Sequence, residues 1–194
     1  MNLSDSFVKA GVKDGDLLML TPNNKNKILR WYRFTTLMHD NNQVLYKDEW
    51  DAIAFIPKVD ITFMGFSFFD QNTRNTFSLR FKIMIGDVEH CEKEIRMNKT
   101  SFPDPEDSKL MFVDIQKEGF KYTDVRQNEK IHIMIKTWED NYSDGYYGYG
   151  TCDSNSDPVN AKNEDDFEVE ESSYSVCRRA TKTTGMIPSI LYAK

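Results

Sequence analysis

The residues with the clearest metal-ligand spacing lie in the acidic stretch 151–166. Asp153, Asn155 and Asp157 stand at alternate positions, and Glu164 falls at the twelfth position of the same count, as the oxygen ligands of a calcium loop do. The sixth position holds Pro158, where such loops need glycine for a sharp turn, and no helical pattern flanks the stretch. We therefore interpret it as a mobile acidic loop and predict no metal site.

The histidine and cysteine side chains are too scattered to form a catalytic group. His39, His90 and His132 are isolated, and His132 is expected to point to solvent because it lies on the polar side of an alternating segment. His90 and Cys91 are neighbours, so on a strand they point to opposite faces and cannot bind one metal. The sequence also lacks a phosphate-binding Gly-rich loop, a nucleophile elbow and an HExxH motif. It predicts no catalytic residue, no cofactor and no enzyme activity.

Two adjacent acidic pairs, Asp165-Asp166 and Glu170-Glu171, are the residues that would suit glycoside chemistry. Glycosidases place two carboxylates on either side of one scissile bond. Neighbouring residues on a strand face opposite sides, so neither pair can supply both groups. A carbohydrate-binding or hydrolytic β-sandwich is therefore the third alternative. A protein-interaction module and a structural subunit of an assembly rank before it.

A Tyr/Gly-rich segment, 141–150, is the strongest candidate for a binding loop. Tyrosine offers a large contact area at a small entropic cost, and loops at the end of a rigid scaffold commonly carry binding residues. Some of these rings could instead cover the end of the fold, and of the neighbouring Phe68 and Phe69 only one can face a given side. The predicted partner-binding residues are Tyr142, Tyr146, Tyr147, Tyr149, Phe68 and Phe69.

Segment 76–87 fixes the fold class that must position these residues. Five apolar residues alternate there with polar ones or methionine over nine positions, a period of two that indicates a strand with one buried face. A half-buried strand needs a sheet and a second layer over it, and no long helical period occurs in the chain. The sequence predicts an all-β, antiparallel sandwich. Further strands are expected at 28–37, 52–56, 59–69, 88–97, 110–115, 120–125, 130–138, 167–170, 174–177 and 186–192.

Two positions in these strands carry specific expectations. Gly65 lies inside an apolar alternation, which suggests a bulge or a close approach of two backbones. Segment 88–97 is charged, which is typical of an edge strand. With 194 residues, of which 13% are aromatic, the chain suits one domain at 28–194, preceded by an approach segment, 1–27.

Charge and composition exclude several partners. The net charge is −6 and no block of Lys or Arg stands out, which argues against nucleic acid and an anionic membrane surface. No apolar run approaches the roughly 20 residues that span a bilayer. Three widely spaced cysteines and a start without a secretory pattern indicate free thiols in the reducing cytoplasm.

Several motifs, in order along the chain, resemble those of the PHR domain of Pam/Highwire-type ubiquitin ligases and of a group of BTB-domain proteins. They are Arg33-Phe34, Asp51-Ala52-Ile53-Ala54-Phe55, Asp60-Ile61, Gly65-Phe66, Tyr146-Tyr147-Gly148 and Gly185-Met186-Ile187-Pro188. The resemblance covers about residues 30–192 and implies an antiparallel sandwich that binds proteins and has no catalytic centre. The chain departs from the family at residues 180–184, at Met186 and at 67–69. No RING or BTB segment accompanies the motifs, so a ligase activity is not implied.

These observations favour a non-catalytic module that recruits or scaffolds another protein. The alternative is a structural subunit of a larger assembly, for example a cytoskeletal one, docked through segment 1–27. The sequence is compatible with both functions.

Overall fold

The described part of the protein consists of β-strands and their connections. In this computed structural model every regular element of the described residues is a strand, and all named pairs are antiparallel, which confirms the predicted all-β class. The residues described are 28–34, 43–46, 49–69, 76–98, 100, 102–104, 110–138, 144–147, 150–151, 165–176, 181 and 184–194.

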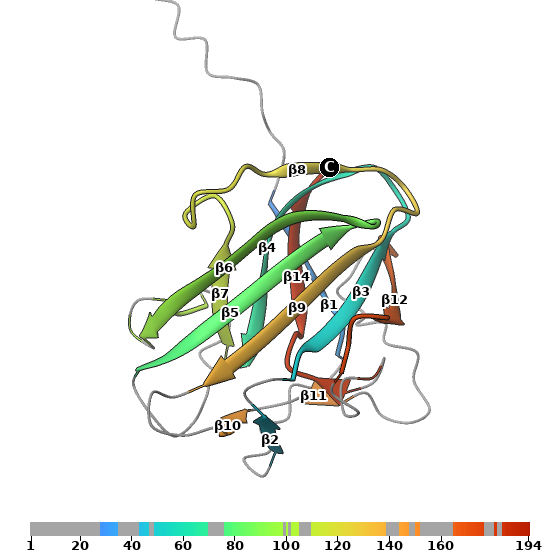
Figure 1. Ribbon diagram of the computed structural model, residues 1–194. Helices are drawn as coiled ribbons and strands as arrows, with labels where there is room; N and C mark the ends of the chain where they lie inside the picture. Colours follow the sequence, from blue (N-terminus) through green and yellow to red (C-terminus); the bar gives the residue numbers. More distant parts are fainter. Residues whose placement is uncertain are drawn as a thin grey trace, which may run out of the picture.

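Five strands form the sheet nearer to the viewer in Figure 1, which we call the front sheet. In spatial order they are β12 (Phe167–Glu171), β3 (Asp51–Pro57), β9 (Ile131–Trp138), β5 (Thr76–Ile85) and β6 (Val88–Asn98). Within the described residues β6 pairs only with β5, so the predicted edge strand is confirmed. Exposed charges on β6, such as Glu94, discourage pairing with another chain.

The second sheet lies behind the first, and we call it the back sheet (Figure 1). Its strands are β1 (Leu29–Tyr32), β14 (Ser189–Ala193), β4 (Ile61–Phe69), β7 (Leu110–Asp114) and β8 (Thr123–Val125). β7 and β8 pair with successive parts of β4, at residues 65–69 and 61–63. The closing strand β14 lies between β1 and β4, so both ends of the described chain are held in one sheet.

Two short strand pairs lie below the main sheets in Figure 1. One joins β2 (Gln43–Tyr46) to β10 (Asp144–Tyr147), and the other joins β11 (Gly150–Thr151) to β13 (Thr184–Gly185). Each brings together segments that are far apart in sequence.

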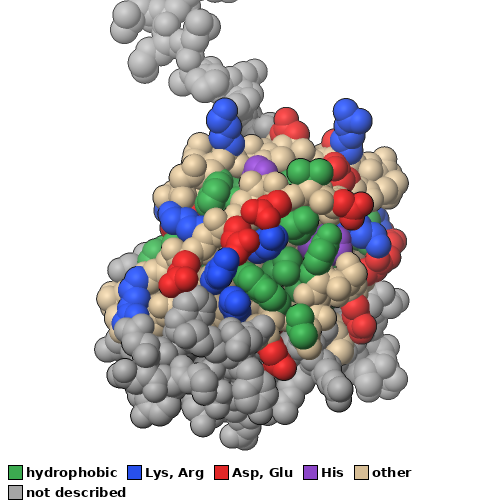
Figure 2. Space-filling view, in the orientation of Figure 1, with side chains coloured by type: hydrophobic (Ala, Val, Ile, Leu, Met, Phe, Trp, Pro, Cys, Tyr) green, Lys and Arg blue, Asp and Glu red, His purple; other side chains and the backbone are tan. Residues whose placement is uncertain are grey.

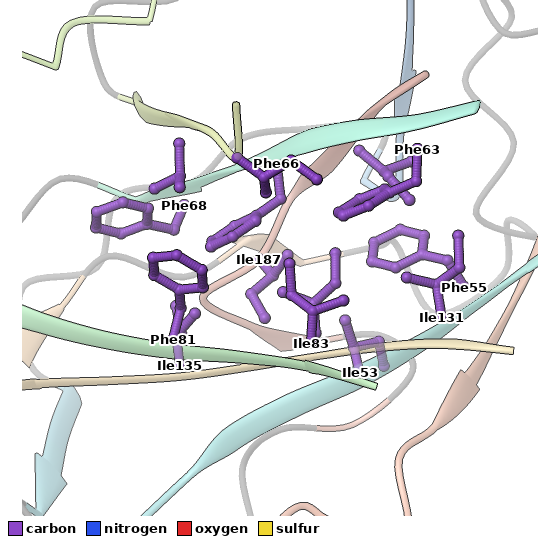
Figure 3. Close-up of a cluster of buried hydrophobic side chains, with 14 of the residues drawn as sticks. Ile53, Phe55, Phe63, Phe66, Phe68, Phe81, Ile83, Ile131, Ile135 and Ile187 are labelled. Atoms are coloured by element: carbon purple, nitrogen blue, oxygen red, sulfur yellow. The ribbon is translucent and has the colours of Figure 1, made fainter. Parts of the chain in front are cut away.

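The hydrophobic core fills the space between the two sheets. The predicted alternation of β5 is confirmed, because Phe77, Leu79, Phe81 and Ile83 are fully buried and Ile85 is 9% exposed. Burying one such side chain contributes roughly 1.5–3 kcal/mol. Figure 3 shows phenylalanines of β4 pointing toward side chains of the front sheet, among them Phe63, Phe66 and Phe68 opposite Phe55, Phe81, Ile83 and Ile131.

Gly65 allows β4 and β7 to approach each other closely, as its place in the alternation predicts. A Cβ atom at Gly65 would lie 2.2 Å from the carbonyl oxygen of Val113, which no side chain can occupy. A bulge occurs at the same point, because Leu191 and Tyr192 of β14 pair with Gly65 and Phe63 and leave Met64 as the extra residue. Both expectations for this position are confirmed.

Several predicted strands differ from the observed ones. Of the predicted strand 28–37, the described residues are in β1 only at Leu29–Tyr32. β14 begins at Ser189 instead of 186, because Pro188 has no N–H for the ladder. β8 occupies only Thr123–Val125 of the predicted 120–125. The predicted strand 174–177 is not a strand in its described part: Ser173 and Tyr174 form a turn, which the hydrogen bond from Ser175 N to Ser172 O closes at 3.0 Å.

Candidate functional site

The outward face of the front sheet carries apolar side chains at its centre. Strand register places Met134 of β9 between Ala52 of β3 and Lys82 of β5. In the next row Met84 of β5 lies opposite His132 of β9. Methionine is flexible and polarisable, and it is common on surfaces that adapt to a partner.

These residues form an apolar cluster that is separate from the core between the sheets. Ala52, Met84 and Met134 are buried, and the partly buried Trp50 and Tyr174 pack against them. Met84 and Met134 form the floor, and Trp50 and Tyr174 the walls, of a shallow hollow of about 340 Å³, which we call the outer depression. Its lining consists of Trp50, Arg80, Lys82, Met84, Glu92, Met134, Lys136 and Tyr174. Figure 2 shows hydrophobic side chains gathered over the middle of the front sheet, with basic and acidic side chains beside them.

The turn after β12 holds both aromatic walls of the outer depression. The N–H of Tyr174 donates to the hydroxyl of Ser172 at 3.3 Å, which shapes the turn. Two residues later, the N–H of Val176 donates to the carbonyl oxygen of Trp50, also at 3.3 Å. Because Trp50 directly precedes β3, this bond ties the turn to the start of a central strand.

His132 supports the same turn, which corrects the prediction that it points to solvent. The side chain is 7% exposed, its Nδ1 lies 2.9 Å from the hydroxyl of Ser172, and its ring meets that of Tyr174 edge to face at 5.0 Å. Alternation identified the outward face correctly, but the turn covers that face here. Burial lowers the pKa of His132, and the charge of Lys130 lowers it further, so the neutral imidazole is favoured.

Ion pairs between β5 and β6 form one rim of the depression. Arg80 donates from Nε to Glu92 at 2.6 Å, and Lys82 lies 3.3 Å from the same carboxylate and 2.6 Å from Glu89. Partial burial opposes ionisation of Glu92, but hydrogen bonds from Arg80 and Lys82 lower its pKa overall. The hydrogen bond to Glu89 is the largest cause of the raised pKa of Lys82. Two cations therefore share one carboxylate at this rim.

Lys136 of β9 lies next to this rim, in the same ladder row as Arg80, and has a different environment. Its ammonium lies over the ring of Trp50, 4.7 Å from the centroid, a cation–π contact. In the ladder Lys136 is directly opposite Arg80, and like charges in that position repel each other. Within the described residues, no carboxylate lies within ion-pair distance of Lys136. The depression therefore has an apolar floor, aromatic walls and one cation, Lys136, that has no carboxylate partner among the residues the structure describes.

The motif residues Arg33, Asp51 and Gly185 converge at a buried site instead of a surface. Arg33 donates to the carbonyl oxygen of Ile187 at 3.3 Å, and the N–H of Met186 donates to Asp51 at 3.1 Å. Burial raises the pKa of Asp51 to about 6, although the charge of Arg33 and the N–H of Met186 oppose the rise.

The packing of this cluster explains why residue 185 is a glycine and indicates that the cluster has a structural function. Gly185 has a φ of 145°, and a Cβ there would lie 3.2 Å from Nη1 of Arg33. Arg33 and Asp51 are fully buried, so no ligand reaches them. The cluster joins the end of β1, the start of β3 and the approach to β14, which is a structural function.

The predicted partner-binding residues do not form one described surface. Phe68 and Phe69 are fully buried on opposite sides of β4, Phe68 in the main core and Phe69 against Phe34 and Leu110, which corrects their assignment to a surface. Tyr146 and Tyr147 lie in β10, opposite Val44 and Gln43 of β2, so this part of the predicted loop is a strand. Tyr142 and Tyr149 lie outside the described residues, so the prediction for the tyrosines remains a prediction.

His90 and Cys91 point to opposite faces of β6, as their adjacent positions predict. Cys91 points into the core at 3% exposure, whereas the ring of His90 lies 2.7 Å from the hydroxyl of Thr123 at the surface. Burial, with a smaller effect of Glu89, raises the pKa of Cys91 to about 12. His39 and the calcium-like positions 153–164 lie outside the described residues. Among those described, no three His, Cys, Asp or Glu side chains converge to hold a metal ion.

Sequence reasoning missed the outer depression, although one signal was present. Met84 and Met134 occupy outward positions in two alternating strands, where polar residues are the norm. Two apolar exceptions on one face are enough to suspect a covered or binding surface. Trp50, Tyr174 and Lys136 carry no local signal, because only strand register and the turn after β12 bring them together.

No protein-family model matches the sequence, and a search of curated proteins finds no match. The part of the chain that the structure describes contains no helix of the length and hydrophobicity needed to cross a membrane.

Proposed function

We propose that this protein is a non-catalytic protein-interaction domain and that the outer depression is its binding surface. The observation that carries the proposal is the placement of Trp50 and Tyr174 over a floor of Met84 and Met134. Trp and Tyr supply much of the binding energy in protein interfaces, and methionine adapts its shape to a partner. The face is rimmed by charges, which is the usual surrounding of an apolar contact patch.

The resemblance to the PHR domain supports the same function. Its motif residues Arg33, Asp51 and Gly185 meet in one buried cluster, as expected for residues that maintain a fold. In that family the domain recruits proteins, and the partner proposed here is likewise another protein, in the cytoplasm. The binding surface proposed here is the front-sheet face, and the tyrosines of segment 141–150 remain a separate proposal that rests on the sequence alone.

The described residues offer little support for catalysis. Ser172 and His132 are within hydrogen-bonding distance, the arrangement of a nucleophile and its base. Both are buried, however, and the hydroxyl of Ser172 also accepts the N–H of Tyr174. This pair serves to hold the turn that carries Tyr174.

A carbohydrate is the second candidate ligand, because sugar rings stack on exposed aromatic side chains and Trp50 and Tyr174 share one hollow. Two features favour a protein instead. Lys136 already lies over the ring of Trp50. The floor is formed by Met84 and Met134, which offer few hydrogen bonds to hydroxyl groups.

Affinity purification with paired variants tests the proposal. The tagged chain, its Trp50→Ala variant and a Val88→Ala control are used to capture proteins from the source cells, after thermal unfolding shows that all three fold. Val88 is 70% exposed at the start of β6 and lies outside the depression, so its variant retains the partners. Proteins that bind the wild type and the control but not Trp50→Ala support the proposal. An identical set of proteins on all three rejects the depression as the binding surface, and binding to a glycan array would favour the second candidate.

A further inference from the structure

We infer that the outer depression binds a short segment of its partner in which a hydrophobic side chain stands next to an aspartate or glutamate. This inference rests on the proposed function and adds the chemistry of the ligand. It combines the size of the hollow, its apolar floor and the charges on its rims.

The hollow is sized for one or two side chains. Its volume of about 340 Å³ is at the lower end of the range of about 300–1,000 Å³ that is typical of small-molecule sites. A shallow space of this size accepts an anchoring side chain from a peptide more readily than a whole cofactor. Because Met84 and Met134 form the floor and Trp50 and Tyr174 the walls, the anchor is aliphatic or aromatic.

The charged residues at the rims determine which residue of the partner can stand next to the hydrophobic side chain. Among the described residues of the lining, Glu92 is the one carboxylate, and it is shared by Arg80 and Lys82. Lys136 has its ammonium over Trp50 without a carboxylate in the described residues, and it faces Arg80 across the ladder. A carboxylate brought in by the partner would lie between two like charges and remove their repulsion.

A basic segment fits the same rims poorly. It would add a third cation beside Lys136 and Arg80, and like-charge contacts at an interface disfavour the wrong partner. Nucleic acid is also a poor fit, because the chain carries a net charge of −6 and affinity for nucleic acid depends largely on cationic contacts to phosphates. The charges therefore specify an acidic neighbour to the hydrophobic anchor.

A thermodynamic cycle tests the inference. The probes are immobilised synthetic peptides in a Gly/Ser background that hold Leu or Phe followed by Asp, Asn or Lys. They are tested against the wild type, Lys136→Met, Lys136→Arg and a Lys117→Met control. Lys117 is exposed in the loop after β7, outside the depression, and methionine keeps the length of the removed lysine stem.

We expect the Asp peptides to bind best and to lose about tenfold in affinity with Lys136→Met. The Asn peptides should be unaffected by that change, Lys136→Arg should retain most of the affinity, and the Lys117→Met control should behave as the wild type. Retention of no peptide, equal binding of the Asp and Lys peptides, or an equal loss for the Asp and Asn peptides would overturn the inference.

The peptide experiment and the affinity purification can fail independently of each other. Partners that depend on Trp50 in affinity purification, together with peptides that show no acidic preference, refute the ligand chemistry alone. Loss of the Trp50 dependence refutes the surface itself.

Discussion

The substitution Gly65→Ala should destabilise the protein more than alanine at Gly86 or Gly119. Both of these glycines have a positive φ, and a Cβ atom there would face open space. At residue 65 the new Cβ would lie 2.2 Å from the carbonyl oxygen of Val113, whereas real Cβ contacts stay above 3.0 Å. The backbones of β4 and β7 must therefore separate by at least 0.8 Å, since 3.0 minus 2.2 is 0.8. Neither atom is the end of a flexible side chain, so no rotamer change relieves the clash.

The expected cost combines two effects. Overpacking typically costs about 1–3 kcal/mol, and weakening one ladder hydrogen bond between β4 and β7 adds roughly 1 kcal/mol. We expect a loss of about 3 kcal/mol in the free energy of unfolding, measured by urea denaturation. Gly86→Ala and Gly119→Ala are matched controls, because their φ values are 58° and 97° and a Cβ there meets nothing closer than 3.9 Å.

The two controls should lose about 1–2 kcal/mol, the cost of a left-handed conformation for alanine. If Gly65→Ala loses no more than they do, the close approach of β4 and β7 is refuted. Gly65 lies in the back sheet, so the variant also leaves the outer depression in place and should retain its ligands once folded.

Two further predictions concern titratable groups. Because the pKa of His132 is lowered in the folded protein, the unfolded chain binds its proton more tightly, and the contribution of this residue to stability is lost as the pH falls below about 6.5. His132→Gln should therefore reduce the decline in the free energy of unfolding between about pH 7.5 and pH 5, and a decline as steep as in the wild type would contradict the lowered pKa. Cys91, with its pKa of about 12, should resist alkylation in the native protein and react when urea unfolds it, as peptide mass spectrometry would record. Native labelling of Cys91 at the unfolded rate would refute its burial.

The sequence contains enough local information to define the sandwich. The alternation that buries Phe77, Leu79 and Phe81 is a property of one segment, and the charged character of β6 identifies an edge without reference to its neighbours. Gly65 was also informative, because glycine inside an apolar strand has few explanations. These features depend on residues within a few positions of each other.

The candidate site depends on information that no single segment carries. Met84, Met134 and Ala52 become neighbours only through the register of three strands, and Trp50 meets Lys136 through the same register. His132 is on the outward face that its alternation indicates, yet a turn from β12 covers it. The periodicity of a strand predicts which way a side chain points but not what another segment places over it.

The proposed binding function depends on the outer depression being the place where a partner contacts this chain. Site-specific photocrosslinking tests this most directly, with a photoreactive amino acid in place of Lys82 at the rim of the depression or of Lys117 in the loop after β7. We predict that position 82 crosslinks to the captured partner and that position 117 does not. Crosslinking from position 117 with none from position 82 would contradict the proposal.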